Sequence, residues 1–197
     1  TFTFDPGAGF QDLAAGETRD VMFTFTATDV HGAVSNTGTV TVTVTGVNDA
    51  PTAKADAIDV NKELAINGNV FANNGSGVDS DPDTSDSFVV SEVNGQAGDV
   101  DMQITLGSNA LLTLNANGTF NYDPNGQFSS LTGTDTATDS FTYQISDGNG
   151  GFDTATVTLT ISANQVPIAN PDNAGSTDEE TPLNNINVLS NDTDPDQ

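Results

Sequence analysis

Basic residues are almost absent from this sequence. Only 3 lysine and arginine residues accompany 28 aspartate and glutamate residues in 197 positions, which gives a formal net charge of −25 at pH 7. An excess of negative charge of this size repels phosphate backbones and anionic lipid headgroups. The composition therefore argues strongly against nucleic acid and anionic membranes as partners.

Cysteine and long apolar runs are missing as well. Without cysteine the chain has no disulfide framework, no thiol nucleophile and no zinc–thiolate site. No apolar run approaches the roughly 18 to 20 residues that a membrane-spanning helix needs, and no signal-peptide pattern opens the sequence. We therefore expect no membrane insertion and no targeting information within this segment.

The residues that are present suffice for a folded protein. Hydrophobic residues make up 35% of the chain and include 11 phenylalanines, which is too many for a disordered acidic tail. Threonine alternates with apolar residues in TGTVTVTVTG (37–46) and TATVTLTIS (154–162). This alternation predicts strands with one buried face. The side chains expected to point inward are Val40, Val42, Val44, Val157, Leu159 and Ile161.

The sequence repeats itself. TFTFDPGAGF at 1–10 aligns without a gap with TFNYDPNGQF at 119–128. The same offset later places Phe23, Phe25 and Asp29 on Phe141, Tyr143 and Asp147. Internal similarity of this kind is the signature of tandem modules.

A second match connects the middle of the chain with its last part. APTAKAD at 50–56 corresponds to VPIANPD at 166–172, NVFANN to NVLSND, and DSDPD at 79–83 to DTDPD at 192–196. The order of the matches predicts three units. Residues 1–49 form the C-terminal part of one repeat, residues 50–163 a complete repeat, and residues 164–197 the N-terminal part of the next.

Within the complete repeat, short strand-like segments are separated by turn signals such as Asn117-Gly118. No segment has a sustained helical period, so we expect an all-β fold with essentially no helix. Regular short strands over about 110 residues are typical of an immunoglobulin-like β-sandwich. The expected strands lie at 53–60, 64–71, 87–94, 101–106, 110–115, 118–123, 139–146 and 151–162. Phe120 with Tyr122 and Phe141 with Tyr143 should share core-facing sides of two of them.

Three segments resemble a known family. VTGVNDAPTA at 44–53 resembles the linker of cadherin-like repeats, in which an Asn-Asp pair before a proline joins two sandwiches, and ATDVHGAVSNTGTVTVTV at 27–44 resembles the loop and last strand before that linker. FTYQISDGNGGFDTATVTLTIS at 141–162 resembles the bacterial VCBS and Big-type repeats. The resemblance implies cadherin-like tandem β-sandwiches of large secreted adhesins and other surface proteins of bacteria. The second linker departs from the pattern, with Gln165 where the first has Asp49.

Carboxylates cluster along the chain. Asp79, Asp81 and Asp83 lie close together, and Asp192, Asp194 and Asp196 repeat their spacing. Oxygen ligands without histidine or cysteine suit calcium, which takes six to eight of them. The segment is not an EF-hand, because Thr84 stands where that loop requires glycine.

Topology strengthens the calcium hypothesis. In an immunoglobulin-like sandwich, the loop after the second strand and the loop between the last two strands return to the entering linker. We therefore expect one calcium site at the first junction, with the ligands Asn48, Asp49, Asp79, Asp81, Asp83 and Asp147. By the same logic Asp29 serves the junction before residue 1, and Asp192, Asp194 and Asp196, with Glu63 as a further contributor, serve the one near 164–166. The alternative is that the acidity is simply a solvated surface.

The sequence offers few of the side-chain combinations that catalysis requires. The only histidine, His31, lies in a turn and aligns with Asn149, so a Ser–His–Asp set is not expected. Paired carboxylates can hydrolyse glycosides, but tryptophan is absent and only two tyrosines occur, so the aromatic platform of a sugar cleft is missing. We predict that the chain is not an enzyme.

The expected function is mechanical. Calcium at the junctions would hold successive spacers in line on the outside of a bacterial cell, in contact with neighbouring repeats of the same protein or filament, for adhesion and biofilm formation. The alternative is a calcium-dependent carbohydrate-binding module, with surface polysaccharide as its partner and an exposed groove on the repeat.

The two part-repeats do not add up to a whole one, because neither contains a counterpart of about 84–118. We expect either a longer protein or completion by neighbouring copies. Strands donated between subunits of a filament are one way in which neighbouring copies could complete the repeat.

Overall fold

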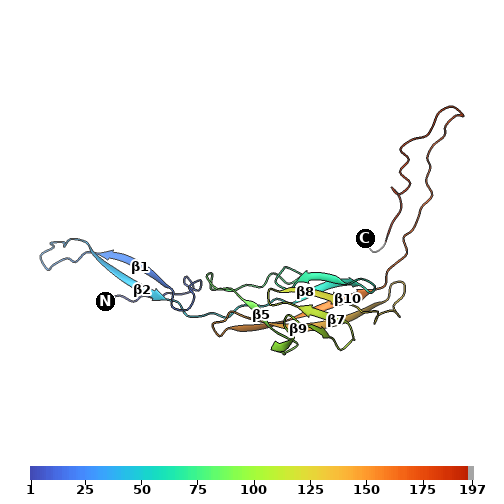
Figure 1. The fold of residues 1–197 in the computed structure, drawn as a ribbon. Coiled ribbons are helices and arrows are strands. Elements are labelled where there is room, and N and C mark those ends of the chain that lie inside the picture. Colours follow the sequence, from blue (N-terminus) through green and yellow to red (C-terminus); the bar gives the residue numbers. More distant parts are fainter. Residues whose placement is uncertain (195–197) are drawn as a thin grey trace.

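Residues 56–162 form two four-stranded sheets, which we call the central sandwich (Figure 1). The computed structural model describes residues 1–194. One sheet has the order β3-β10-β9-β5, with β3 (Asp56–Asn61), β10 (Phe152–Ser162), β9 (Thr136–Ser146) and β5 (Val89–Val93). The other has the order β4-β8-β7-β6, with β4 (Ile66–Asn69), β8 (Thr119–Asp123), β7 (Leu111–Leu114) and β6 (Gln103–Thr105). The predicted all-β sandwich is confirmed.

All neighbouring strands of the sandwich are antiparallel except β3 and β10, which run parallel. Each expected strand has an observed counterpart, with different limits. The segment expected at 101–106 is only β6, because Asp101 has a φ of 62° and its carboxylate accepts a hydrogen bond from the Ala116 amide in a turn. The one helical element of residues 1–194 is a short 3-10 turn, Ala97–Asp99.

The core lies between the two sheets. Val157, Leu159 and Ile161 are fully buried, as their alternation with threonine predicted. Phe120, Tyr122, Phe141 and Tyr143 are at most 3% exposed, which confirms that they pack in the core. Each buried aliphatic or aromatic side chain contributes about 1.5 to 3 kcal/mol through removal of apolar surface from water.

A separate two-stranded hairpin precedes the sandwich. It consists of β1 (Thr18–Phe25) and β2 (Gly38–Thr45), which pair along their whole length. Val40, Val42 and Val44 are half-buried while the threonines between them are exposed, so the predicted alternation holds but the buried face is only partly covered.

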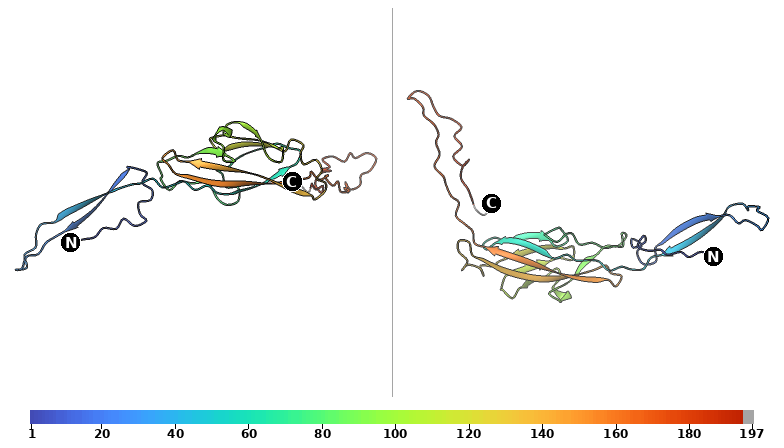
Figure 2. Two further views of the ribbon diagram at one scale, coloured as in Figure 1. Left: turned by 90° about the horizontal axis from the view of Figure 1, so that it is seen from below. Right: turned by 180° about the vertical axis from the view of Figure 1, so that it is seen from behind.

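The last described part of the chain, residues 164–194, leaves the sandwich at the end opposite the hairpin (Figures 1 and 2). Its backbone is extended and contains no named strand, and one isolated antiparallel bridge joins Ile168 to Thr193. Throughout residues 1–194, no helix has the length and apolar character needed to cross a membrane.

Candidate metal centre at the repeat junction

Three segments meet where the chain enters the central sandwich. The linker at 46–51 arrives from the hairpin, the loop that carries DSDPD follows β4, and the turn at 147–151 joins β9 to β10. A pair of backbone hydrogen bonds, Thr52 N to Ser80 O at 2.7 Å and Ser80 N to Thr52 O at 3.1 Å, fixes the acidic loop beside the linker. The expected convergence of these loops is therefore present in the structure.

Asp147 anchors the β9–β10 turn to the linker. Its Oδ1 accepts the Asn149 amide at 2.7 Å and the Gly151 amide at 3.0 Å, and its Oδ2 accepts Asn48 Nδ2 at 2.9 Å. Burial acts to raise the pKa of Asp147, but the hydrogen bonds from Asn48 and the turn amides outweigh it and hold the pKa below the ordinary value. The carboxylate is thus ionised and held against the linker.

The turn needs glycine at 151. A Cβ there would come within 2.1 Å of Asp147 Oδ2 and 2.8 Å of the Ala50 Cα atom. No side chain fits at such distances, so the absence of one allows the turn, the carboxylate and the linker to pack together.

Asp83 is the most deeply buried carboxylate of the junction, with 1% of its surface exposed. Its Oδ2 accepts the Asp49 amide at 2.8 Å, and its own amide donates to Asp81 Oδ1 at 2.9 Å. Burial raises the pKa of Asp81. The hydrogen bond from the Asp83 amide opposes this rise, while the charges of Asp83, Asp147 and Asp86 add to it. Several negative charges therefore act on one small region, and none of these carboxylates forms an ion pair within residues 1–194.

Three oxygens in this region are buried and accept no hydrogen bond within the described residues: Asn48 Oδ1, Asp81 Oδ2 and Asp83 Oδ1. A buried polar atom without a partner costs about 1 to 3 kcal/mol. One of them belongs to the linker and two to the acidic loop. Amide and carboxylate oxygens of this kind are the ligands that calcium prefers, so the residues present fit a hard divalent cation.

Carboxylates alone do not make up a metal site at the junction. Within residues 1–194, no group of three histidine, aspartate or glutamate side chains could hold a metal ion by itself. Oxygens of Asp83 and Asp147 are engaged by backbone amides, so a complete coordination shell would also need the Asn48 amide oxygen and backbone carbonyls or water, all of which calcium accepts.

Asp79 differs from these residues because it has no open oxygen. Its Oδ1 accepts the Lys54 amide at 2.7 Å and its Oδ2 accepts the Tyr143 hydroxyl at 2.9 Å, so both oxygens are already engaged inside the sandwich. Burial and the neighbouring Asp79 charge raise the pKa of Tyr143, which keeps its hydroxyl protonated as a donor. The assignment of Asp79 as a calcium ligand stays a prediction.

Removal of the Tyr143 hydroxyl tests this inner contact. Tyr143→Phe would leave Asp79 Oδ2 without its hydroxyl donor and would remove the contacts of the same hydroxyl with the Lys54 carbonyl at 3.0 Å and the Val70 carbonyl at 3.3 Å. We expect the free energy of unfolding to fall by about 1.5 kcal/mol, as for a hydrogen bond to a charged group. Urea denaturation measures the change, and an unaltered midpoint would contradict it.

Two further residues near the junction were not predicted as part of the site, although Asp86 belongs to the acidic cluster that begins at Asp79. Asp86 accepts a hydrogen bond from Asn149 Nδ2 at 2.7 Å and adds its charge to the field at Asp81. Asp12, from the loop before the hairpin, accepts from the Thr84 hydroxyl through its carbonyl at 3.2 Å and forms an ion pair with Arg19 at 2.6 Å. The acidic loop therefore also contacts the preceding unit. The aligned repeats carry no signal for such contacts across the junction.

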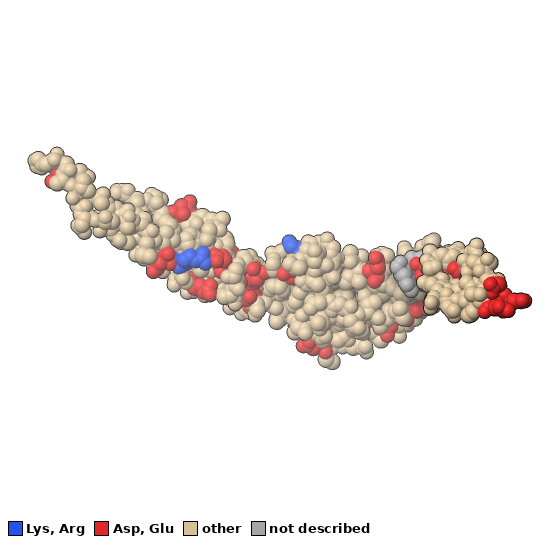
Figure 3. Space-filling model, turned by 90° about the horizontal axis from the view of Figure 1, so that it is seen from above, with Lys and Arg blue, Asp and Glu red and all other residues tan. Residues whose placement is uncertain are grey.

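The other predicted ligands lie at separate places. At the far tip of the hairpin, Asp29 Oδ1 accepts the amides of His31 and Ala33 at 2.8 Å, an arrangement like that of Asp147. Asp192 accepts the Asn170 amide at 2.8 Å, as Asp79 accepts that of Lys54. Asp194 lies at the end of the described residues, and Asp196 lies outside them. Acidic side chains are thus distributed along the length of the molecule, with few basic ones among them (Figure 3).

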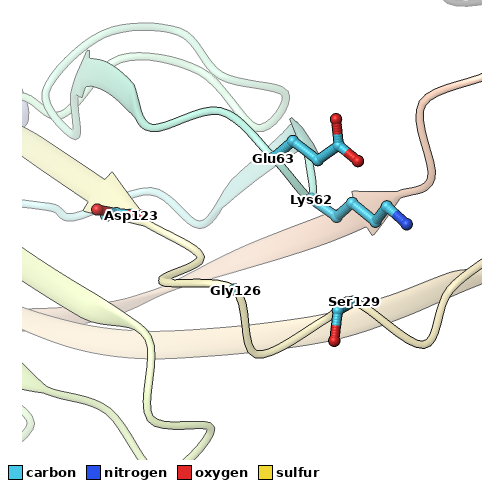
Figure 4. Close-up of a pocket in the computed structure, with 5 residues that line it drawn as sticks. All are labelled: Lys62, Glu63, Asp123, Gly126 and Ser129. Carbon is cyan, nitrogen blue, oxygen red and sulfur yellow. The ribbon is translucent and has the colours of Figure 1, made fainter.

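Glu63 lies in the turn after β3, at the end of the sandwich from which residues 164–194 leave. It lines a shallow pocket of about 350 Å³ with Lys62, Asp123, Gly126 and Ser129 (Figure 4). The same turn contacts the second linker, because Asn61 Nδ2 donates to Asn164 Oδ1 at 3.0 Å. A contribution of Glu63 to a site at that linker stays a prediction.

Lys62 connects the turn after β3 to the loop between β8 and β9 at this end of the sandwich. Its Nζ donates to the Leu131 carbonyl at 2.7 Å. We expect Lys62→Met to retain the apolar packing of the stem and lose about 0.5 to 1 kcal/mol of unfolding free energy. Thermal unfolding in chelator measures the loss. A variant as stable as the original chain would show that water replaces the carbonyl contact without cost.

The sandwich, the Asn-Asp linker and the returning acidic loops define a cadherin-like module. The family model described as the bacterial cadherin-like domain matches residues 48–163, and the chain belongs to this family. Among solved structures, the chain is similar to human mucin-like protocadherin EC1-2, with 18% identity, a TM-score of 0.48, and coverage of 73% of this chain and 68% of that one.

A second similar structure is the endo-fucoidan hydrolase MfFcnA4 from glycoside hydrolase family 107. The identity is 14%, the TM-score 0.34, and the match covers 75% of this chain but only 19% of that one. No curated protein matches the sequence.

Proposed function

We propose that the chain is a calcium-stabilised extender segment of a large, secreted bacterial surface adhesin or extracellular filament. In this proposal residues 50–163 are one complete repeat, and residues 1–49 and 164–197 are parts of its neighbours. The segment serves adhesion and biofilm formation as a spacer and performs no catalysis. Its direct partners are the adjacent repeats of the same protein or filament.

The observation that carries the proposal is the set of buried oxygens without partners at the junction. Asn48 Oδ1 belongs to the linker, whereas Asp81 Oδ2 and Asp83 Oδ1 belong to the sandwich. A divalent cation bound by both would connect the linker to the sandwich and offset the repulsion between the carboxylates. Bending at the linker would then break coordination bonds, so the junction becomes stiff.

The dimensions of the sandwich suit a spacer. Strands β9 and β10 have 11 residues each, which corresponds to about 36 Å at about 3.3 Å per residue. The hairpin and residues 164–194 leave from opposite ends of this length (Figure 2). Each repeat in an array would therefore add its full strand length to the reach of the protein.

The carbohydrate-binding alternative gains no support from the surface of the sandwich. It predicts an exposed groove with aromatic side chains, but Phe120, Tyr122, Phe141 and Tyr143 are buried in the core. The exposed aromatic side chain of the sandwich, Phe152, is 54% exposed near the β9–β10 turn. One ring without a partner does not form a stacking platform for sugars.

Calorimetric titration of the chelated chain with calcium tests the proposal. We expect binding heat and a rise in the melting temperature, because a ligand that binds only the folded state stabilises it. X-ray scattering should show a larger maximum dimension with calcium than with chelator. Absence of both binding heat and thermal stabilisation would remove the metal from the proposal.

A further inference from the structure

The first and last strands of the central sandwich lie side by side. β3 pairs with β10 over six residues, from Asp56 with Val157 to Asn61 with Ser162. This pairing is parallel, whereas the other neighbouring strands of the two sheets run antiparallel. The strand through which the chain enters the sandwich is therefore hydrogen-bonded to the strand through which it leaves.

The parallel direction of this pair decides where the chain enters and leaves. An antiparallel pair would place the start of β3 and the end of β10 at the same end of the sandwich. Because the pair is parallel, the start of one strand and the end of the other point to opposite ends, and the two linkers leave the sandwich at opposite ends (Figure 2). A pull on both linkers therefore acts along the strands.

Such a pull loads the β3–β10 pair in shear. It would draw Asp56, at the start of β3, toward the first junction and Ser162, at the end of β10, in the opposite direction. The two strands would slide past each other, and the hydrogen bonds between them would be strained at the same time. A force that separates the strands from one end breaks the same bonds one after another. Sliding should therefore require a much larger force than separation from an end.

Buried side chains oppose the same movement. Val60 on β3 and Ile161 on β10 are 1% and 0% exposed, and both belong to the hydrophobic core between the two sheets. Sliding of β3 along β10 would move Val60 out of its place in the core. Protein interiors are packed as densely as organic crystals, so they offer no free volume for such a displacement. The core therefore resists sliding together with the hydrogen bonds.

Further contacts hold both strands in place. Lys62 N donates to Ser162 O at 2.9 Å and Lys62 Nζ to the Leu131 carbonyl at 2.7 Å, which extends the contacts of β3 beyond its last residue. Near the start of β3, Ala57 N donates to the Asn74 carbonyl at 2.9 Å, so the second edge of this strand is bonded as well. β10 pairs with β9 along all of its 11 residues. The shorter strand, β3, is therefore the one expected to slide.

We propose that the β3–β10 pair is a mechanical clamp that bears tension along the array of repeats. The inference rests on the proposed spacer function, because tension reaches the sandwich only through linkers attached to neighbouring repeats. The clamp consists of strand pairing and core packing within residues 56–162, and it requires no metal ion. Its resistance depends on the direction of the force, which is high along the strands and low when β10 is separated from β3 at one end.

Single-molecule force spectroscopy of the whole chain with two pairs of attachment points tests this direction dependence. The chain has no cysteine, so introduced cysteines define where the force acts. Val47→Cys with Val166→Cys places the attachments on the two linkers, and Leu64→Cys with Val166→Cys places both at the end where β10 finishes; the three side chains are 61% to 79% exposed. In chelator and at one loading rate, we expect a several-fold higher unfolding force for the first pair. Equal forces for the two pairs would overturn the proposal.

Two matched core variants locate the clamp. Val60→Ala shortens a side chain of β3 that is 1% exposed, and Val93→Ala makes the same change on β5 at a side chain that is 0% exposed. Urea denaturation should show a comparable loss of stability in both variants. Forced unfolding is governed by the unfolding rate, so only Val60→Ala should lower the force between the linker attachments, because β5 is still in place when β3 leaves β10. An equal fall of the force in both variants would contradict the clamp.

Measurement in chelator keeps the clamp separate from the calcium site. If the chain bound no calcium, the proposed metal would be rejected, and the direction dependence of the unfolding force would still be observed. Equal forces in the two directions would reject the clamp and leave the calorimetric result unchanged. Thermal melting of each cysteine and alanine variant verifies that the central sandwich is folded before it is pulled.

Discussion

The effect of Asp83→Asn on stability should change sign when calcium is added. In chelator the variant should melt at the same temperature as the original chain or slightly higher, because it removes a buried charge and keeps an oxygen for the Asp49 amide. In calcium the original chain should gain about 2.7 kcal/mol when the ion is at 100 times its dissociation constant. This gain corresponds to roughly 5 to 10 °C in melting temperature, and the variant should lose most of it.

Comparison of the variant with the original chain, in chelator and in calcium, distinguishes a calcium ligand from a residue that is only buried. Asp59→Asn is the matched control, since Asp59 is exposed on β3 and takes no part in the junction. It should keep the whole calcium-dependent increment. If Asp83→Asn also kept the whole increment, the ion would bind elsewhere and the oxygens of Asn48, Asp81 and Asp83 would need another explanation.

The fold could be predicted from the sequence because the patterns that specify its strands are local. Alternation of threonine with Val157, Leu159 and Ile161 specifies one buried face, and the structure buries all three. Strand limits were less predictable, since they depend on contacts from distant segments. The Ala53 amide, for example, is bonded to the Asp153 carboxylate and not to a strand, so β3 begins only at Asp56.

The site was predictable to the level of which loops meet. Recurrence of the Asp-x-Asp spacing and the returning loops of the sandwich placed Asp81, Asp83 and Asp147 near the linker. The sequence could not separate Asp79 from Asp81, because two positions along an irregular loop can face opposite ways. Only the hydrogen bonds from Lys54 and Tyr143 show that Asp79 turns inward.

Asp56 shows more clearly what could not be predicted from the sequence. It begins β3, and nothing in APTAKAD distinguishes it from an exposed strand residue, yet it is 3% exposed and lies near Asp79. Its Oδ1 accepts Asn74 Nδ2 at 2.9 Å, while its Oδ2 accepts no hydrogen bond within the described residues. Burial raises the pKa of Asp56 to about 6; the Asn74 hydrogen bond opposes the rise and the Asp79 charge adds to it.

This raised pKa gives Asp56 its own contribution to the pH dependence of stability. Between the ordinary aspartate pKa and about 6, the folded chain holds a proton on Asp56 that the unfolded chain has released, so the contribution of Asp56 to stability falls as pH rises through this window. Above it the loss is constant, on the order of 3 kcal/mol. Asp56→Asn, which keeps an oxygen for Asn74 and carries no charge, should therefore be more stable than the original chain at pH 7 by up to that amount.

Urea denaturation in chelator, repeated from pH 4 to pH 8, measures the difference between the two chains. The difference should be small near pH 4, grow until about pH 6 and then level off, because carboxylates that do not interact with Asp56 titrate alike in both chains and cancel. Asp59→Asn should give a flat difference across the range. An Asp56→Asn variant less stable than the original chain at pH 7 would mean that the ionised carboxylate has partners, such as ordered water or a cation, that compensate for its burial.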